Sequence, residues 1–405
     1  MSARNIQNGF LSLVDVDFVD KSEFEKISKR CNPKDNDVLI SCSGSIGRVA
    51  VVNDGNDYVM VRSAAMVRPV SINPYYLMFA LRSGQLQTQM QKASKQTAQA
   101  NLFLGAIQSL LVPVPPKAEA QRITQVAGQT ISVVNEIEEN RESASRTVLQ
   151  VKAKILDLAI RGQLVPQDPT DEPASVLLER IRAGKEELIR QGKIKRDKKE
   201  SVIFRGEDNS YYEKIGTEVR CIDNELPFEL PDSWMFVRLK HIGEIVGGGT
   251  PKTNINEYWD GNIPWLTPAD FSGYEEMYVS SGARTITEIG LKYSSAQMLP
   301  ANSVLYSSRA PIGYIAITAN PVSTNQGFKS VVPYDFTMSP YLYCCLKART
   351  GDIVQRATGT TFKEISGSEM AETIIPLPPI AEQKRIFEKA TQLLNIISTI
   401  EKSLS

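Results

Sequence analysis

Residues 115–123 read Pro-Pro-Lys-Ala-Glu-Ala-Gln-Arg-Ile, and they open the stretch around which the chain is organised, Lys117 to Arg161. This stretch contains no proline, and its only glycine, Gly128, lies near the start. Apolar or small residues recur along it in alternating steps of three and four, with one position skipped: Ile123, Val126, Thr130, Val133, Ile137, Ala144, Val148, Val151, Ile155 and Leu158. That spacing predicts one seam of a two-stranded coiled coil. A helix of this length spans roughly 65 Å, so we expect a spacer between two bodies.

The same opening occurs a second time. Residues 378–386 read Pro-Pro-Ile-Ala-Glu-Gln-Lys-Arg-Ile, 263 positions after the first phrase, counted from Pro115 to Pro378. A second stripe follows at Ile386, Ala390, Leu393, Ile397, Ile400 and Leu404. Two unrelated amphipathic helices would explain the stripes but not the matching openings. Self-similarity along a chain indicates duplicated architecture.

Composition sets broad limits. A chain of 405 residues with 42% hydrophobic content supports two or three folded domains. The 46 basic and 46 acidic side chains cancel, so any nucleic-acid surface has to be local. The five cysteines (Cys31, Cys42, Cys221, Cys344 and Cys345) show no Cys-x-x-Cys spacing. We therefore expect a reduced, cytoplasmic protein without a metal site, and we find neither a signal peptide nor a membrane-spanning run.

The chain has a single histidine, His241. Histidine is the usual general base near neutral pH, so catalytic triads that depend on it are excluded unless His241 serves. Carboxylate-based and metal-based enzymes remain open on this count. A structural role for His241 is the favoured interpretation.

Residues 1–115 are predicted to form a first α/β domain. It has a strand at 37–41, a glycine-containing turn at 43–47, a strand at 48–52 and a helix capped by Asn73-Pro74. A strand-like run, Leu110 to Val112, ends it. Residues 116–200 should be spacer helices, with Gly162 ending the first and Pro173 opening the second. Within them the basic tract 193–199 is as well explained by a solvated helix end as by a phosphate contact.

Residues 201–231 are polar and predicted to be an irregular linker. Residues 232–378 are predicted to form a second α/β domain whose landmarks match the first, and 379–405 a C-terminal spacer helix. Residues 303–313 correspond to 37–47, and Ser339-Pro340 corresponds to Asn73-Pro74. The offset is 266 in mid-domain and 263 at the Pro-Pro phrase. The fold class is therefore α/β (α+β), a tandem repeat of globular domain plus helix.

This repeat resembles the specificity subunit of type I restriction-modification systems. The residues that carry the resemblance are Gly247-Gly248-Gly249-Thr250-Pro251-Lys252-Thr253, residues 258–270, Thr324-Asn325-Gln326-Gly327-Phe328, and Ile375-Pro376-Leu377-Pro378-Pro379 with Glu382-Gln383. In the first copy they are residues 5–9 and 155–164. The resemblance covers nearly the whole chain, with its separate phrases in the family's order.

The resemblance implies a non-catalytic DNA-binding protein. Two target recognition domains would each read one half of a split double-stranded DNA site, with the long helices paired antiparallel as a pseudo-twofold coiled coil between them. Two modification subunits, which carry S-adenosylmethionine and methylate adenine, would dock on this chain, and restriction subunits would join them. No cofactor is expected on the chain itself. Half-sites about one helical turn apart lie roughly 34 Å from each other, within reach of such a rod.

The sequence departs from the family's pattern in the first copy. The segment from Trp234 to about Leu266 has no counterpart there, because Met1 aligns with about Thr267. The C-terminal helix likewise stops at Ser405, short of its partner's extent. We therefore expect an N-terminally incomplete first domain, and a truncated or regulatory subunit with one working recognition domain stays an alternative.

Candidate DNA-contacting residues lie on loops with donors, acceptors or cations. In the second domain they are Thr250, Lys252, Thr253, Ser307, Ser308, Arg309, Thr358, Thr360, Thr361 and Lys363. In the first domain they are Ser43, Ser45, Arg48, Lys95, Gln96 and Asn101. For each, a plain surface turn is the competing interpretation.

Other functions fit less well. The glycine-rich run at 247–249 lacks the Gly-Lys-Ser/Thr ending of a nucleotide-binding loop. Neither Pro-Pro pair stands in the Asn/Asp-Pro-Pro-aromatic context of an adenine methyltransferase. Trp259 and Trp265 are predicted to be core residues, although base stacking is the alternative.

Overall fold

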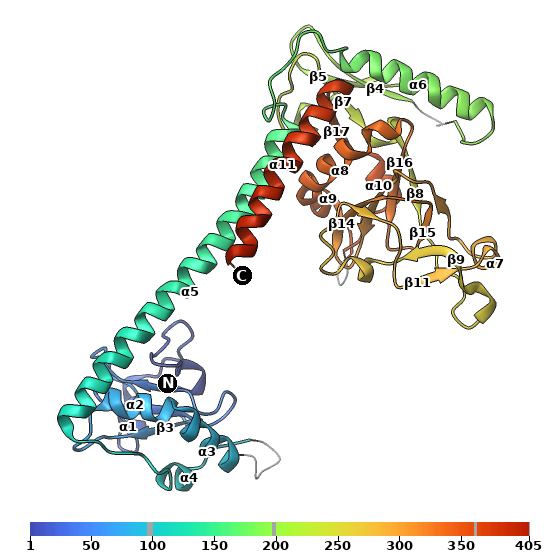
Figure 1. Ribbon diagram of the computed structural model, residues 1–405. Coiled ribbons are helices and arrows are strands. Elements are labelled where there is room, and N and C mark those ends of the chain that lie inside the picture. The colour runs from blue at the N-terminus through green and yellow to red at the C-terminus, as the bar shows by residue number, and fades with distance from the viewer. Residues whose placement is uncertain (95–99, 197–199, 360–362, 405) are drawn as a thin grey trace. The chain divides into compact units, whose positions relative to one another are not determined.

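The computed structural model describes residues 1–94, 100–196, 200–359 and 363–404 (Figure 1). The chain divides into two compact units, Met1–Glu142 and Ser143–Ser405. The helix α5 (Lys117–Ile160) is continuous and contributes to both. Each unit is described by itself.

The first unit is a small sheet with helices against it. Its elements before α5 are η1 (Ala3–Asn5), α1 (Lys21–Ser28), β1 (Val38–Ser41), β2 (Val49–Val51), β3 (Ala64–Val67), α2 (Pro74–Arg82), α3 (Gly84–Ser94) and α4 (Leu104–Gln108). The strands lie in the antiparallel order β2-β1-β3. Successive strand side chains point to opposite faces. Val38 and Ile40 pack with Leu77 and Leu81 of α2, while Leu39 packs on the other face.

The α2 helix begins as its sequence predicts. Asn73 precedes Pro74, and its side-chain oxygen accepts hydrogen bonds from the backbone N–H groups of Tyr75 (2.9 Å) and Tyr76 (3.1 Å). Asparagine is a favoured N-cap because it pairs N–H groups that have no partner inside the helix.

Replacing Asn73 with alanine is expected to lower the first unit's free energy of unfolding by about 1 kcal/mol, because both N–H groups lose their acceptor. Urea denaturation measures the change. Asn73→Asp, which keeps the acceptor, is the control and should stay close to the parent. An equal loss in both variants would contradict the capping role.

Among its described residues, the second unit forms four further sheets. Its helices are α6 (Ala174–Arg190), α7 (Glu288–Lys292), α8 (Ser339–Ala348), α9 (Thr350–Arg356), α10 (Gly367–Ala371) and α11 (Ile380–Leu404), with short 3-10 turns η2 (Asp223–Glu225), η3 (Leu239–His241), η4 (Asn256–Tyr258), η5 (Pro268–Phe271) and η6 (Phe336–Met338). Its strands are β4 (Ser201–Arg205), β5 (Tyr211–Ile215), β6 (Glu218–Cys221), β7 (Met235–Arg238), β8 (Gly243–Gly247), β9 (Trp259–Leu266), β10 (Tyr278–Val279), β11 (Arg284–Ile286), β12 (Met298–Leu299), β13 (Val304–Ser308), β14 (Ile312–Thr318), β15 (Val322–Thr324), β16 (Lys329–Pro333) and β17 (Ile374–Leu377). The sheet orders are β10-β14-β13-β16-β8, β11-β9-β15-β12, β17-β7 and β4-β5-β6.

The predicted duplication is confirmed at the level of strand register. In the first unit Val38 pairs with Val51, and in the second Val304 pairs with Ile317, so both partners shift by the same 266 positions. The α4 and α10 helices, and the starts of α5 and α11, are 263 positions apart. The order β2-β1-β3 reappears as β14-β13-β16 inside the larger sheet.

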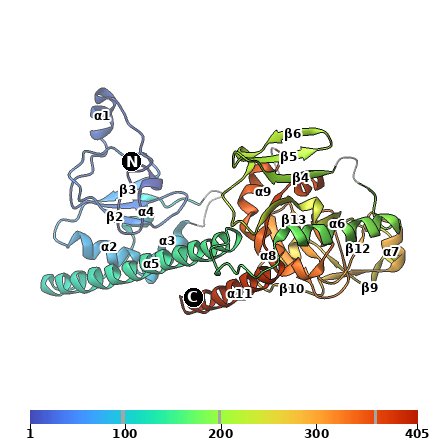
Figure 2. The same cartoon turned by 90° about the horizontal axis from the view of Figure 1, so that it is seen from above.

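Within the second unit, α11 runs antiparallel to the end of α5, and Figures 1 and 2 show the two side by side. Lys152 pairs with Glu401 near the end of α11, and Gln167, just beyond α5, pairs with Glu382 at its start. Ile155 and Ala159 share a buried core with Ile386 and Ala390 of α11. The predicted coiled-coil seam is confirmed there.

Three sequence predictions are wrong. Residues 201–231 are not irregular, because β4–β6 form an antiparallel sheet. The α6 helix is not a spacer: Leu177, Leu178 and Ile181 pack into the second unit's core. Leu110 to Val112 do not form a strand.

The seam of α5 is covered only in part, as the shorter C-terminal helix leads one to expect. Val126, Val133 and Ile137 are exposed.

Candidate nucleic-acid interface

Side chains from three predicted loops of the second unit converge beside the end of β13. Thr250 donates to Gln326 (2.5 Å), whose backbone carbonyl accepts from the Lys329 ammonium (3.4 Å). Lys329 and Arg309 both reach Glu364, each with an N–O distance of 3.6 Å. These five residues are called the polar cluster below. Of them, Gln326, Lys329 and Glu364 were not predicted, although Gln326 lies in a motif that carries the family resemblance.

The backbone explains why these loops meet. Ser307 forms an isolated bridge with Phe328, which brings residues 325–329 against the end of β13. The N–H of Ile365 donates to the carbonyl of Ser308 (3.0 Å) and brings in the segment before α10. The polar cluster is thus assembled from regions far apart in the sequence.

The glycine-rich run at 247–249 contains two glycines that pack closely against other parts of the protein backbone. A Cβ on Gly248 would lie 2.0 Å from the Asn325 carbonyl oxygen, and one on Gly249 would lie 2.3 Å from the Ser295 carbonyl carbon. These two glycines permit close packing against the protein's own backbone. The run leads into η4, a single 3-10 turn, rather than a phosphate-binding helix.

The two tryptophans are core residues, as predicted, and they hold the exposed loop in place. Trp259 and Trp265 are buried and meet edge to face, with ring centroids 5.1 Å apart. The Trp265 indole donates to the Gly249 carbonyl (2.9 Å) and the Trp259 indole to the Lys252 carbonyl (3.2 Å). Lys252 and Thr253 are exposed, so both present their side chains to solvent from a braced loop.

The predicted DNA contacts of the Ser307 and Ser308 side chains do not fit the structure, because both residues are fully buried. The Ser307 hydroxyl donates to the Pro311 carbonyl (2.7 Å) and accepts from the Tyr314 N–H (2.8 Å), so it holds the turn after β13. The buried Ser308 hydroxyl has no partner among the described residues. Exposure begins at the next residue, Arg309.

The first unit has the same turn. The Ser41 hydroxyl donates to the Ser45 carbonyl (2.5 Å) and accepts from the Arg48 N–H (2.9 Å), and each partner is 266 positions before its counterpart. Ser43 forms a bridge with Asn101, where the second unit has Arg309 near Glu364. The Ser45 residue is exposed, and Ser43, Arg48 and Asn101 are partly exposed.

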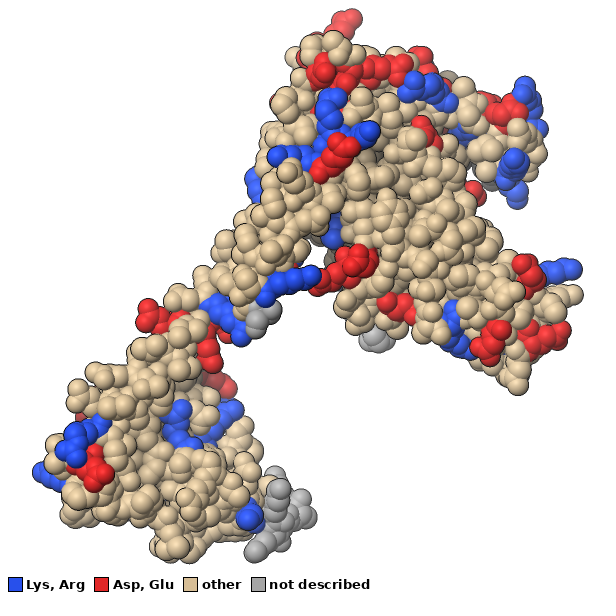
Figure 3. Space-filling model, in the orientation of Figure 1, with Lys and Arg blue, Asp and Glu red and all other residues tan. Residues whose placement is uncertain are grey.

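The remaining candidates lie at or beyond the edge of the described residues. Thr358 and Lys363 are exposed on either side of the gap at 360–362. Thr360, Thr361, Lys95 and Gln96 lie outside the described residues. On the face shown in Figure 3, Lys and Arg side chains are interspersed with Asp and Glu, which fits the zero net charge.

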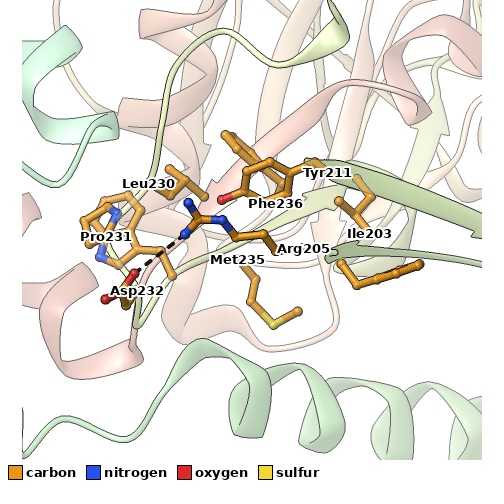
Figure 4. Close-up of a pocket in the computed structure, with 10 residues that line it drawn as sticks. Ile203, Arg205, Tyr211, Leu230, Pro231, Asp232, Met235 and Phe236 are labelled. Atoms are coloured by element: carbon orange, nitrogen blue, oxygen red, sulfur yellow. Dashed lines mark ion pairs between the residues drawn. The ribbon is translucent and has the colours of Figure 1, made fainter. Parts of the chain in front are cut away.

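A separate cavity of about 220 Å³ lies between the β4–β5 strands and residues 230–236 (Figure 4). Arg205 reaches from its rim toward Asp232, with an N–O distance of 3.8 Å, and lies over the Tyr211 ring. Its walls are largely apolar and include Ile203, Leu230 and Phe236. The cavity therefore belongs to the packing of the β4–β6 sheet rather than to the polar cluster.

Comparison with known proteins places this duplicated architecture in a family. The sequence model described as the type I restriction modification DNA specificity domain matches residues 2–144 and 231–405. The chain belongs to this family. The stretch between the two matches contains the end of α5, α6 and the β4–β6 sheet.

Members of the family with curated names are specificity subunits. The MjaIX subunit of Methanocaldococcus jannaschii is 45% identical over 160 residues, which are 39% of this chain and 37% of that protein. The EcoR124I/EcoR124II subunit of Escherichia coli is 33% identical over 41% of this chain and 42% of its own length. The HindI subunit of Haemophilus influenzae is 22% identical over 88% of this chain and 78% of its own. Alignments with the first two thus span about two-fifths of their length.

The fold is also found in a solved structure. A chain from a study of complex assembly and conformational transition in a type I R-M system aligns over 92% of this chain and 77% of its own, at 17% identity and a TM-score of 0.61. No helix among the described residues is long and apolar enough to cross a membrane.

Proposed function

We propose that this chain is the non-catalytic, sequence-specific DNA-binding subunit of a cytoplasmic type I restriction-modification complex. The observation that carries the proposal is the shared turn in its two domains. Ser41 and Ser307 hold the same backbone turn, while a partly exposed residue at the same position of the turn differs: it is Ser43 in one domain and Arg309 in the other. One scaffold with two sets of exposed polar groups suits the reading of two different half-sites.

The proposed partners follow from the family. Two modification subunits would bind this chain, hold S-adenosylmethionine and methylate adenine, and restriction subunits would complete the complex. The chain itself would bind double-stranded DNA and hold it in position for the modification and restriction subunits. No cofactor is proposed on this chain.

The proposed DNA contacts are the exposed and partly exposed members of the predicted set. The exposed ones are Thr250, Lys252, Thr253, Thr358 and Lys363 in the second domain and Ser45 in the first, and the partly exposed ones are Arg309, Ser43, Arg48 and Asn101. Thr360, Thr361, Lys95 and Gln96 are proposed on sequence alone. Arginine can donate two parallel hydrogen bonds to guanine, so Arg309 is the proposed base-reading group, and Lys252 is a phosphate contact.

The test is DNA binding by the complex with its modification subunits, measured against salt concentration. Lys252→Ala is expected to weaken binding to all sequences alike and to reduce the slope of log affinity against log salt by about 1. Arg309→Ala is expected to cost about 1–3 kcal/mol on the cognate site and to relax the preference at one position. Equal affinity of the parent complex for every duplex would refute the proposal.

A matched control is Lys384→Ala, because Lys384 is an exposed lysine of α11, outside the polar cluster. This variant should leave both the affinity and the salt slope unchanged. A loss as large as that of Lys252→Ala would indicate a general charge effect rather than a local contact.

A second candidate is a subunit that reads DNA through its second domain alone. It is favoured by the smaller sheet of the first domain, which holds three strands where the second domain's sheet holds five. Methylation of the full bipartite site can be compared with that of an inverted repeat of the second half-site. Modification of the inverted repeat alone would support this candidate.

A further inference from the structure

The segment Leu110 to Val114 is the first unit's counterpart of a paired strand in the second unit. Its counterpart 263 positions later includes β17, whose residues Ile374–Leu377 pair antiparallel with β7. In the second unit Ile374 and Leu377 are 4% and 0% exposed, whereas Leu111 and Val114 in the first are 81% and 73% exposed. Among the described residues, none forms a strand with 110–114.

The exposed segment 110–114 has one contact in common with β17, its counterpart in the second unit. The Tyr76 hydroxyl of α2 donates to the Pro113 carbonyl (2.8 Å). In the second unit the Tyr341 hydroxyl of α8 donates to the Pro376 carbonyl (2.5 Å), 263 positions after Pro113. A tyrosine of the neighbouring helix thus anchors the same carbonyl in both units, and an anchored segment loses less entropy when a strand is added to it.

At the start of α5, two charged side chains also lack the partners that their counterparts in α11 have. In the second unit the buried Glu382 accepts from the Trp234 indole (2.9 Å) and the Gln167 amide (2.6 Å), and Arg385 pairs with Asp171 (3.1 Å). The counterparts of these two in α5 are Glu119 and Arg122. Both are exposed, and neither has a side-chain partner among the residues described.

Two neighbouring surfaces are also open. In the second unit the outer edge of β16 is covered by β8, but β3, its counterpart, is the last strand of its sheet. On α5, the seam that α11 covers near Ile155 continues to Ile137, Val133 and Val126, which are 61%, 54% and 61% exposed. The open surfaces are thus the continuation of an interface that exists in the second unit.

We propose that residues 110–123 and the adjoining seam of α5 bind a separate polypeptide that supplies the groups provided in the second unit by residues 163–171 and 234–238. Its chemistry is specific: an indole N–H donor for Glu119, an acidic side chain for Arg122, and an extended apolar strand that pairs with 110–114. This is strand addition to a preformed edge, in which backbone hydrogen bonds bind and side-chain pockets select. The proposal does not depend on the DNA-binding function.

A second copy of the chain is a poorer occupant. Its own β7 is paired with β17, and its Trp234 is engaged with Glu382. Releasing both to bind another molecule would open the second unit. The occupant must therefore supply these groups from residues that are not already paired.

The test uses the full chain and a synthetic peptide with the sequence of residues 229–240, which contains Trp234 and β7. Fluorescence anisotropy of the labelled peptide should show saturable binding, and the amides of residues 110–114 should exchange more slowly with peptide than without. Replacing the tryptophan of the peptide with alanine should weaken binding about tenfold or more, as for a buried aromatic anchor.

The variant with Leu111→Asp and Val114→Asp should abolish binding while the chain stays folded, because both side chains are exposed in the free protein. Val70→Asp is the matched control, since Val70 is 95% exposed in the same unit, and it should bind like the parent. Unchanged exchange at 110–114 with saturating peptide, or binding that survives the double substitution, would overturn the proposal. A chain that dimerises alone and is made monomeric by the double substitution would overturn it in favour of a second copy.

Discussion

Replacing Glu213 with alanine is expected to lower the free energy of unfolding of the second unit by about 3 kcal/mol at pH 7. Glu213 on β5 is 1% exposed and accepts from Arg238 of β7 (2.8 and 3.1 Å) and from Arg220 of β6 (2.7 Å). Its removal leaves the buried Arg238 guanidinium with one fewer counterion. The remaining partners of Arg238 are Glu225 (2.7 Å) and, at a longer N–O distance of 3.6 Å, Glu372. Removing one member of a buried ion pair costs more than the pair itself contributes.

The same carboxylate predicts a pH dependence. Burial disfavours its charge, but hydrogen bonds from Arg238, Arg220 and Ser201 outweigh burial and lower the pKa of Glu213 from 4.5 to about 2. Because the folded-state pKa is depressed, this contribution to stability is fully present above about pH 4.5 and is lost as pH falls toward 2. Glu213→Gln should flatten the fall in unfolding free energy over that window.

Denaturant unfolding of the parent, Glu213→Ala and Glu213→Gln between pH 7 and pH 3 measures both effects. Glu218→Ala is the matched control, because Glu218 is an exposed glutamate on the neighbouring strand β6, and it should change stability by less than about 0.5 kcal/mol. If Glu213→Ala were as stable as this control, the ion network would not be what holds the β4–β6 sheet to β7.

Replacing Trp234 with alanine is expected to cost about 3–5 kcal/mol, the usual range for a large buried aromatic residue. Trp234 is 4% exposed, meets the Tyr341 ring edge to face, and donates its indole N–H to Glu382 (2.9 Å). The alanine variant loses the apolar contact, leaves a cavity and removes one of the two donors to a buried carboxylate.

Trp234→Phe separates these contributions. The ring is largely kept, but Glu382 loses the indole donor, so we expect a cost of about 1–3 kcal/mol from the unpaired buried oxygen. Thermal or urea unfolding of the three proteins gives the comparison. Equal stabilities of the phenylalanine variant and the parent would show that the hydrogen bond to Glu382 contributes nothing to the fold.

The sequence was most informative where local pattern and packing agree. The two Pro-Pro openings and their offset of 263 positions predicted the starts of α5 and α11, because a proline pair before an apolar stripe marks a helix start whatever lies around it. The mid-domain offset of 266 predicted the strands β1 and β13, since each is a run of apolar residues followed by a glycine-containing turn.

The failures have physical causes. The β4–β6 sheet was missed because the buried position of its middle strand is a glutamate, Glu213. A glutamate is expected at the surface unless a buried partner is known, and this partner, Arg238, lies 25 positions away in the chain. Leu110 to Val112 have strand-forming side chains, but a strand also needs a neighbour to pair with. For Ser307 and Ser308, a hydroxyl at a strand end looks the same in sequence whether it faces solvent or the interior.

The polar cluster was predicted in part. Its members Arg309 and Thr250 were predicted because loops with cations and hydroxyls suit DNA. Lys329 and Glu364 were missed because the contacts that unite them with Arg309 join segments 20 and 55 residues away from it in the chain. Such contacts depend on the meeting of β13, β16 and the segment before α10, which no local pattern describes.

The buried hydroxyls of Ser41 and Ser307 fix the backbone of each turn without involving the side chains that face outward. Because the bonds that fix the backbone lie inside, the outward residues are free to vary without refolding the domain. Each turn can then change its outward side chains through a few substitutions, and the two turns can diverge independently of each other.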